Sequence, residues 1–371
     1  SSGMDVTLLG PLPTPGVSFL ANSNNQVGLV ISASHNLFED NGIKFFNKDG
    51  QKFSAELEKR IESKLTQDMV AVDSINLGKA ARMNDAQGRY IEFCKSTFLG
   101  LDLTGLSILL DCANGATYSV APKVFEELGA EVHAIGSSPD GININQNCGS
   151  TSPEFLKEEI TKGEYDLGIA FDGDGDRILI VTSNGDILDG DDILYILSQN
   201  LIEGSGVIGT LMTNKALEIH FGENNIDFYR SDVGDKYVLQ KLVEKNWLLG
   251  GEPSGHIICL DSAPTGDAII AALKFLDAVK NDNFSIDKTL NNFKKFPQTL
   301  INLKVDNPNN IILSDKFWSE VTKIESILGN DGRVLIRPSG TEPLIRIMVE
   351  SKDSSTSENL CNSLAELALT L

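Results

Sequence analysis

The chain lacks the features that mark several specialised classes of protein. Its five cysteines are widely separated and form no CxxC pair, so we expect reduced thiols rather than a disulfide framework or a zinc site: Cys94, Cys112, Cys148, Cys259 and Cys361. No apolar run approaches the roughly 20 residues that span a bilayer, and the first residues do not resemble a secretory signal. A cytoplasmic location is therefore the default expectation.

Basic residues are also scarce. Asp and Glu number 52 against 31 Lys and Arg, and the formal charge of −21 would repel nucleic acid and anionic membranes. Neither is expected as a partner, and an anionic substrate would need a locally basic pocket. The proportions of hydrophobic residues (41%) and charged residues (22%) are ordinary, and 371 residues exceed what one core supports, so three or more domains are expected.

Short segments rich in Val, Ile and Leu alternate with amphipathic segments, which is typical of α/β layers. Strands are predicted at 27–31, 106–110, 167–171, 177–181 and 207–212. Helices are predicted at 54–65, 153–161, 193–201 and 237–245. This alternation predicts mainly parallel, buried sheets.

From about Thr299 the pattern changes to that of a smaller α+β domain. Its strands are predicted at 300–305, 333–337 and 344–350. Linkers near 99–104, 203–206 and 295–299 divide the chain into four expected domains, at residues 1–102, 103–202, 203–297 and 298–371.

A cluster of acidic residues follows the predicted strand at 167–171. Asp172, Asp174 and Asp176 alternate with glycines, so the loop can curl and direct three carboxylates to one point. An EF-hand is excluded because its sixth and twelfth positions hold Arg177 and Ser183. The spacing favours magnesium completed by a phosphate oxygen. A solvated Asp-Gly turn is the alternative, at the cost of repulsion between like charges.

Ser34 lies in a loop after the first predicted strand, and its hydroxyl could carry a phosphoryl group. Taken alone, it is better explained as a helix cap or a turn made by Ser and Asn. His35 and Lys44 could assist proton transfer, although a loop histidine and a surface lysine are the plain alternatives. Arg177 would offset charge in the acidic loop and could contact a phosphate.

Two further loops carry polar groups. Glu252 and Ser254 could hold adjacent sugar hydroxyls, although their sequence alone is a common turn. Arg337, the hydroxyls and backbone N–H groups of residues 338–343, and Arg346 are donors suited to phosphate. A bare turn between two strands is the alternative there.

In this order, the loops at 32–36, 172–177, 251–256 and 337–343 resemble the four active-site loops of the α-D-phosphohexomutase superfamily. The resemblance spans nearly the whole chain. It implies three similar mixed-sheet α/β domains plus a smaller α+β C-terminal domain around a central cleft. The segments 31–36, 41–46 and 233–237 and the glycine-containing acidic loop are most similar to the bacterial branch that interconverts glucosamine 6-phosphate and glucosamine 1-phosphate for amino-sugar nucleotide and cell-wall precursor synthesis.

The resemblance also implies a role for each loop. Ser34 would be the phosphoserine and would join Asp172, Asp174 and Asp176 around one Mg²⁺, with catalysis assisted by neighbouring side chains. The remaining residues would bind substrate: Lys236, Glu252, Ser254, His256, Arg337, Ser339, Gly340, Thr341 and Arg346. The phosphoryl group would pass to the sugar, give a bisphosphate, and return to the serine from the other position.

Some features depart from the family pattern. Leu37 stands where the family commonly has Pro, and Pro253 where the glucosamine branch commonly has Gln, but neither change removes a catalytic group. The family's opening segment, with an Arg-bearing loop, is not seen, so the first domain is expected to be truncated at its N-terminus. The alternatives are a phosphomannomutase or phosphoglucomutase, a non-catalytic scaffold relative, or a phosphatase with Asp172 as nucleophile. A homodimer is compatible with the resemblance.

Overall fold

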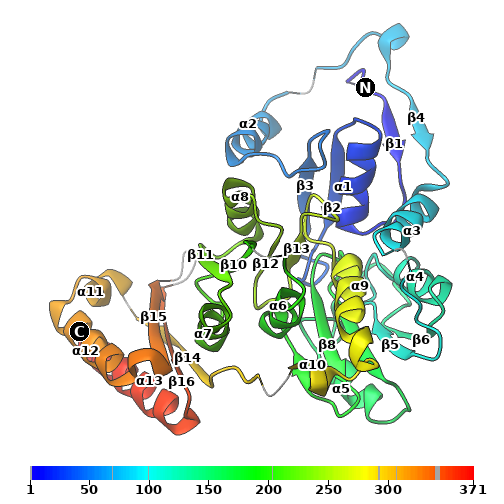
Figure 1. The fold of residues 1–371 in the computed structure, drawn as a ribbon. Coiled ribbons are helices and arrows are strands. Elements are labelled where there is room, and N and C mark those ends of the chain that lie inside the picture. Colours follow the sequence, from blue (N-terminus) through cyan, green and yellow to red (C-terminus); the bar gives the residue numbers. More distant parts are fainter. Residues whose placement is uncertain are drawn as a thin grey trace. The chain divides into compact units, whose positions relative to one another are not determined.

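The structure is a computed structural model that describes residues 2–68, 70–98, 100–202, 204–290, 293–305, 307–338 and 343–371, except the side chain of Asn309. Its internal contacts define two compact units. The first contains Ser1–Met212 and Ile226–Asn291, and the second contains Thr213–Asn225 and Asn292–Leu371. Figure 1 labels most of their helices and strands. In the described parts of the chain, no helix combines the length and the apolar character that a membrane span requires.

Four sheets form the framework of the first unit in the residues that the structure describes. A five-stranded sheet has the order β6-β5-β7-β8-β9: β5 is Ser107–Asp111, β6 Glu131–Ile135, β7 Leu167–Phe171, β8 Ile178–Thr182 and β9 Ile187–Leu188. A four-stranded sheet has the order β11-β10-β12-β13: β10 is Gly206–Thr210, β11 Asp227–Ser231, β12 Leu249–Gly251 and β13 Ile257–Cys259. The other two sheets are strand pairs: β1 (Val6–Leu8) with β4 (Ala80–Arg82), and β2 (Gly28–Ser32) with β3 (Gly42–Phe46).

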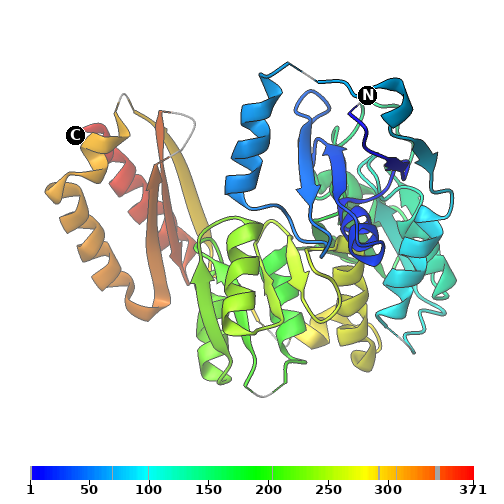
Figure 2. The same ribbon diagram turned by 90° about the horizontal axis from the view of Figure 1, so that it is seen from above.

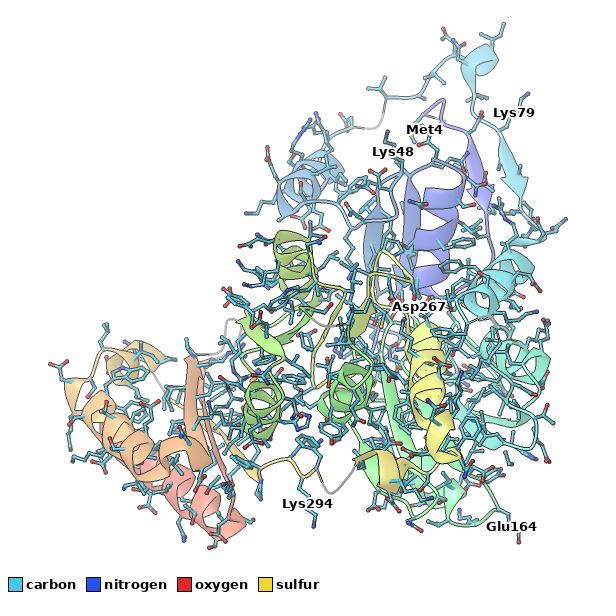
Figure 3. All side chains as sticks on the ribbon, in the orientation of Figure 1. Met4, Lys48, Lys79, Glu164, Asp267 and Lys294 are labelled. Carbon is cyan, nitrogen blue, oxygen red and sulfur yellow. The ribbon has the colours of Figure 1, made fainter. Side chains whose placement is uncertain are left out.

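The helices of the first unit are α1 Thr14–Ser23, α2 Ala55–Leu65, α3 Ala86–Ser96, α4 Ala121–Glu127, α5 Glu154–Ile160, α6 Gly190–Ser198, α8 Asp235–Lys245, α9 Ala268–Val279 and α10 Ile286–Leu290. Several of them pack against these sheets, among them α1 on β2, α5 on β5 and β7, α8 on β10 and β12, and α9 on β8, whereas α2 has no buried residue. Side-chain caps fix several of their starts. Ser54 caps α2 and Asp267, labelled in Figure 3, caps α9 by accepting from two backbone amides. These caps satisfy backbone N–H groups that would otherwise have no partner at the helix starts.

Most predicted elements are confirmed to within a few residues. The strand predicted at 167–171 coincides with β7, and the helix predicted at 54–65 is α2 with its cap. The helix predicted at 193–201 begins earlier, at Gly190, because a capping box between Asp189 and Asp192 starts α6 before the apolar repeat becomes visible.

The expectation of mainly parallel sheets needs correction. The central pairs β5–β6, β5–β7, β10–β11 and β10–β12 are parallel. The pairs β2–β3, β7–β8 and β12–β13, however, are antiparallel, as are β15 (Gly332–Pro338) and β16 (Leu344–Ser351) of the second unit, and the four loops singled out in the sequence connect just these strands. Short loops can join only antiparallel neighbours, since a parallel crossover needs a dozen or more residues.

The second unit is built on an antiparallel sheet with the order β14-β16-β15: β14 is Gln298–Lys304, β15 Gly332–Pro338 and β16 Leu344–Ser351. Figure 2 shows α12 (Asp315–Leu328) and α13 (Ser354–Leu369) covering one face of it, and α11 is Pro308–Ile312. The predicted α+β character is confirmed. Alternate residues of the strands, such as Ile345 and Ile347, fill the core under the helices.

Helix α7 (Lys215–Glu223) belongs to this second unit. The carboxylate of Glu350 is fully buried and accepts the backbone N–H of Lys215 at 2.9 Å. Arg333 pairs with Glu350 through two nitrogens, at 2.7 and 3.0 Å, and donates to the Thr213 carbonyl at 2.8 Å. A negative charge at the N-terminus of a helix is favourable, so these contacts attach α7 to the sheet.

Candidate active site

The acidic loop turns tightly between β7 and β8. One oxygen of Asp172 accepts the backbone N–H groups of Asp176 and Arg177, both at 3.1 Å, and the Asp172 carbonyl accepts that of Gly175 at 3.1 Å. All three aspartates are buried, and each offers an oxygen within 4.8 Å of those of the other two. The predicted convergence of three carboxylates is therefore present.

Neighbouring elements fix the backbone of this loop. Thr14 at the start of α1 donates its N–H to the Asp174 carbonyl at 2.9 Å and its hydroxyl to the Asp174 carboxylate at 2.5 Å. Ala116 donates to the Gly173 carbonyl at 2.8 Å, and Ala268 at the start of α9 donates to Gly175 at 3.1 Å. The carboxylates are thus held by backbone contacts to three separate segments.

The surroundings move the pKa values of two of these aspartates in opposite directions. Burial, and then the charges of Asp176 and Asp174, raise the pKa of Asp172 well above its usual range. Burial alone would also raise the pKa of Asp176, but the charges of His256, Lys44 and Lys52 outweigh it and lower that pKa well below its usual range. The surroundings therefore favour the ionised form of Asp176 and the protonated form of Asp172.

Lys44 connects the acidic loop with Ser34. Its ammonium lies 2.6 Å from an oxygen of Asp174, 3.1 Å from one of Asp176 and 3.5 Å from Ser34 Oγ. Burial favours the neutral amine, but the two carboxylates outweigh this and raise the pKa of Lys44. The group is a fixed cation in the neutral pH range.

The donor set fits a hard cation. Asp172 Oδ2, Asp174 Oδ1 and Asp176 Oδ1 are buried and have no hydrogen-bond partner among the residues that the structure describes. Buried carboxylate oxygens without partners are costly, and oxygen ligands are those that Mg²⁺ and Ca²⁺ prefer. The three aspartates could therefore hold a metal ion.

Ser34 has an unusual backbone conformation. Its φ of +53° lies in the left-handed region, which costs a non-glycine residue on the order of 1–3 kcal/mol. Its N–H donates to Ser32 Oγ at 2.9 Å, and its carbonyl accepts the side-chain amide of Asn145 at 2.9 Å. Such strain is typical of functional loops, and here contacts on both sides of the residue maintain it.

His35 follows Ser34 in this loop, and Arg177 ends the acidic loop. Each has a buried side-chain nitrogen, His35 Nδ1 and Arg177 Nε, without a hydrogen-bond partner within the described parts of the chain. Burial, and then the positive charge of Arg177, lower the pKa of His35. The imidazole is therefore neutral near pH 7 and able to accept a proton.

The loop between β12 and β13 lies next to the acidic loop. The Gly255 carbonyl accepts the N–H of Ile178, and the buried His256 places Nδ1 3.6 Å from Asp176 and Nε2 3.7 Å from Asp235. Asp235 also forms an ion pair with Lys52. His256, Asp235 and Lys52 therefore extend the charged network of the acidic cluster.

The other predicted sugar-binding residues lie around this network. Glu252 is almost fully buried, and one of its oxygens accepts the N–H of Gly234 at 2.8 Å. Ser254 is exposed in the same turn. Lys236 is exposed near the start of α8, with its ammonium 4.7 Å from the centre of the Tyr237 ring.

The predicted phosphate-binding residues belong to the second unit. Arg337 on β15 and Arg346 on β16 lie directly opposite each other across the sheet. Neither has an ion pair with any residue that the structure describes, and like charges in this position are destabilising without an anion. Ser339, Gly340 and Thr341 lie outside the described residues.

Four residues of this site were missed in the sequence. Asp235 lies within the segment 233–237 that the sequence analysis singled out, so only its role was missed. Thr14 lies between two prolines, a weak sign of a fixed turn before a helix. Lys52 and Asn145 carry no local signal, since either residue type is ordinary in an exposed loop.

Four family profiles match successive parts of the chain. Their descriptions are phosphoglucomutase/phosphomannomutase α/β/α domain I at residues 1–70, domain II at 89–185, domain III at 189–296 and the C-terminal domain at 300–367. Each of the four active-site loops proposed from the sequence falls within a different profile.

Similar curated proteins are phosphoglucosamine mutases. That of Legionella pneumophila strain Corby is 49% identical over 377 residues, which cover 99% of this chain and 83% of the relative. That of Marinomonas sp. strain MWYL1 is 50% identical over 375 residues, which cover the same shares of the two chains.

Solved structures share the fold. A phosphoglucomutase/phosphomannomutase family protein of Burkholderia thailandensis matches with a TM-score of 0.81 and 24% identity, over 99% of this chain and 82% of that one. N-acetylphosphoglucosamine mutase of Aspergillus fumigatus, solved in complex with GlcNAc-6P and magnesium, matches with a TM-score of 0.74 and 17% identity, over 96% and 92%.

Proposed function

The chain belongs to the phosphoglucomutase/phosphomannomutase family, and on this premise we propose that it is a phosphoglucosamine mutase. It interconverts glucosamine 6-phosphate and glucosamine 1-phosphate through a phosphoserine enzyme and a bisphosphate intermediate. The product would supply amino-sugar nucleotide and cell-wall precursor synthesis. The full-length similarity to phosphoglucosamine mutases supports the choice of sugar.

One observation carries this proposal: a serine hydroxyl, a fixed ammonium and a carboxylate cluster meet at one point. Lys44 lies between Ser34 Oγ and the oxygens of Asp174 and Asp176. A phosphoryl group on Ser34 would therefore lie against a cation. Mg²⁺ held by the three aspartates and the phosphoserine would supply further neutralisation of phosphoryl charge.

The residues around Ser34 suit both steps of a phosphoryl exchange. In the forward step the bond between Ser34 Oγ and phosphorus breaks while a sugar hydroxyl oxygen bonds to phosphorus. The neutral imidazole of His35 is our candidate base for the hydroxyl proton, and Lys44 stabilises the departing serine oxygen. Arg177 offers its guanidinium to the transferred group. In the reverse step the other phosphate of the intermediate returns to Ser34.

Binding of the rest of the substrate is assigned to two groups of residues. Glu252, Ser254, His256 and Lys236 would orient the sugar. The donors Arg337, Arg346, Ser339, Gly340 and Thr341 would hold the phosphate that is not being transferred. Arg337 and Arg346 support this assignment, because an anion would offset the repulsion between two opposed guanidinium groups.

We further propose that hexosamine phosphate is the main partner, since the net charge of −21 disfavours nucleic acid and anionic membranes. The five cysteines are free and buried, which favours a reducing, cytoplasmic environment. A homodimer is compatible with the family, and size-exclusion chromatography with light scattering tests it.

The decisive experiment measures conversion of glucosamine 6-phosphate by the protein with Mg²⁺, with glucose and mannose phosphates as competitors. The Ser34→Ala variant should be inactive, and intact mass should show a phosphoryl group on the wild type but not on this variant. Ser63→Ala, an exposed serine on α2, is the matched control and should keep full activity. A preference for another hexose phosphate would reassign the substrate. Phosphorylated Ser34 without any turnover would favour a scaffold protein instead.

A further inference from the structure

Asn145 reaches from the segment between β6 and α5 to the loop that contains Ser34. Its side chain is 6% exposed, and its Nδ2 donates to the carbonyl of Ser34 at 2.9 Å and to that of Asn36 at 2.6 Å. Two carbonyl acceptors fix the orientation of the amide, because only its nitrogen carries hydrogens. Both amide hydrogens are thus used to hold the serine loop.

The backbone of Asn145 is itself fixed. Its φ of +56° is left-handed, a conformation that asparagine tolerates better than most residues, and its N–H donates to the Ala113 carbonyl at 2.9 Å. A second hydrogen bond holds the same segment four residues later, where the Gly149 N–H donates to the buried carboxylate of Asp111 at 2.6 Å. Asn145 therefore holds the serine loop from a rigid support.

The contact lies where the serine loop, the acidic loop and the Asn145 segment meet. A Cβ added to Gly173 would lie 2.6 Å from the Ser34 carbonyl oxygen and 2.7 Å from Asn145 Nδ2. Ser34 has a left-handed backbone whose N–H is held by Ser32 and whose carbonyl is held by Asn145. Asn145 supplies the second of these two restraints, from outside the loop.

We propose that Asn145 is a positioning residue for phosphoryl transfer, which holds the Ser34 backbone so that Oγ faces Lys44 and the acidic loop. The inference rests on the proposed mutase function. Loss of the side-chain amide removes neither the phosphorylatable hydroxyl nor any of the charged groups around it. The loop can then leave its strained conformation, which misaligns Oγ and admits water to the phosphoserine.

The test compares Asn145→Asp and Asn145→Gly with the same changes at Asn147. Aspartate has the shape of asparagine but cannot donate to two carbonyls, and glycine keeps the left-handed backbone without any side chain. Asn147 is the matched control because it lies in the same segment, also has a left-handed backbone (φ +54°) and is exposed. Each variant is assayed for kcat, for KM with glucosamine 6-phosphate, for thermal unfolding and for the half-life of the phosphoserine by intact mass.

Both Asn145 variants should lose about 10- to 100-fold in kcat, the size expected for misplacement by about 1 Å, while KM changes less than about threefold. Their phosphoserine should hydrolyse several times faster than that of the wild type. The Asn147 variants should match the wild type in both readouts. A merely structural role would lower the unfolding temperature without shortening the phosphoserine half-life.

Two results would overturn the inference. One is an Asn145→Gly variant that folds and keeps wild-type kcat and phosphoserine half-life. The other is a loss confined to thermal stability, with kcat recovered at low temperature. If the wild type itself neither turns over hexose phosphates nor carries phosphate on Ser34, the proposed function fails instead, so the two failures are distinguishable.

Discussion

Replacing Lys44 by methionine tests whether its ammonium group stabilises the acidic loop by neutralising the buried carboxylates. Methionine keeps most of the length and volume of the side chain and removes only its charge. The carboxylates that Lys44 contacts are 2% and 7% exposed, and the lysine side chain itself is 22% exposed. Breaking a buried ion pair by removing one partner costs roughly 3–5 kcal/mol. Because Lys44 is partly hydrated, we expect the lower end, about 3 kcal/mol.

Differential scanning calorimetry in the presence of EDTA measures this loss. For a folding unit larger than 150 residues, each kcal/mol shifts the unfolding temperature by about 2 °C or somewhat more, so Lys44→Met should unfold about 6 °C below the wild type. Mg²⁺ should then stabilise the variant more than the wild type, because its own charge replaces the missing ammonium. Turnover should fall at least about a hundredfold, since the serine oxygen loses its neighbouring cation.

The control is Lys48→Met, a change of the same chemistry at an exposed lysine just after β3 (Figure 3). It should alter neither the unfolding temperature nor turnover. The reasoning is refuted if Lys44→Met unfolds at the wild-type temperature in EDTA. It is refuted equally if Mg²⁺ raises the unfolding temperatures of variant and wild type by the same amount.

Three further substitutions test the packing and the titration of the first unit. Gly173→Ala should cost about 2 kcal/mol of stability and most of the activity, because its methyl group would lie 2.6 Å from the Ser34 carbonyl oxygen. Gly88→Ala lies at an exposed helical position with no atom within 4 Å of the new methyl group, so it should instead stabilise the protein by about 1 kcal/mol. Urea unfolding measures both changes, and equal changes in the free energy of unfolding for Gly173→Ala and Gly88→Ala would contradict this. Burial raises the pKa of Asp267 to about 6 despite its hydrogen bond from Tyr90, so the folded state binds a proton more tightly than the unfolded state. Its free energy of unfolding therefore falls by about 3 kcal/mol as pH rises from about 3 to 7. The free energy of unfolding of Asp267→Asn, relative to the wild type, should therefore rise by about 3 kcal/mol over that range, and a difference that is constant with pH would refute the assignment.

Much of the fold could be read from local patterns. Strand β7 and helix α2 lie where the local sequence predicted them, because β7 is a continuous apolar run that is buried at every position and α2 begins at its Ser54 cap. The direction of pairing was harder to predict. The six residues between β7 and β8 are too few for a parallel crossover, so the length of this connection predicts the antiparallel pairing that is observed. The alternation of strands and helices along the chain had suggested parallel pairing instead.

What the sequence by itself determined is the chemistry of each loop: a serine, an alternating run of aspartates and a loop with two polar groups have those properties wherever they fold. Only the tertiary structure decided which groups meet. Lys44 reaches Asp174 across 130 residues of sequence, and Asn145 reaches Ser34 across 111. The same placement drives the pKa values of Asp172 and Asp176 apart, although both belong to one short loop. Charge and hydrogen-bonding capacity belong to the residue, whereas distance and burial, which set their strength, depend on how the whole chain packs.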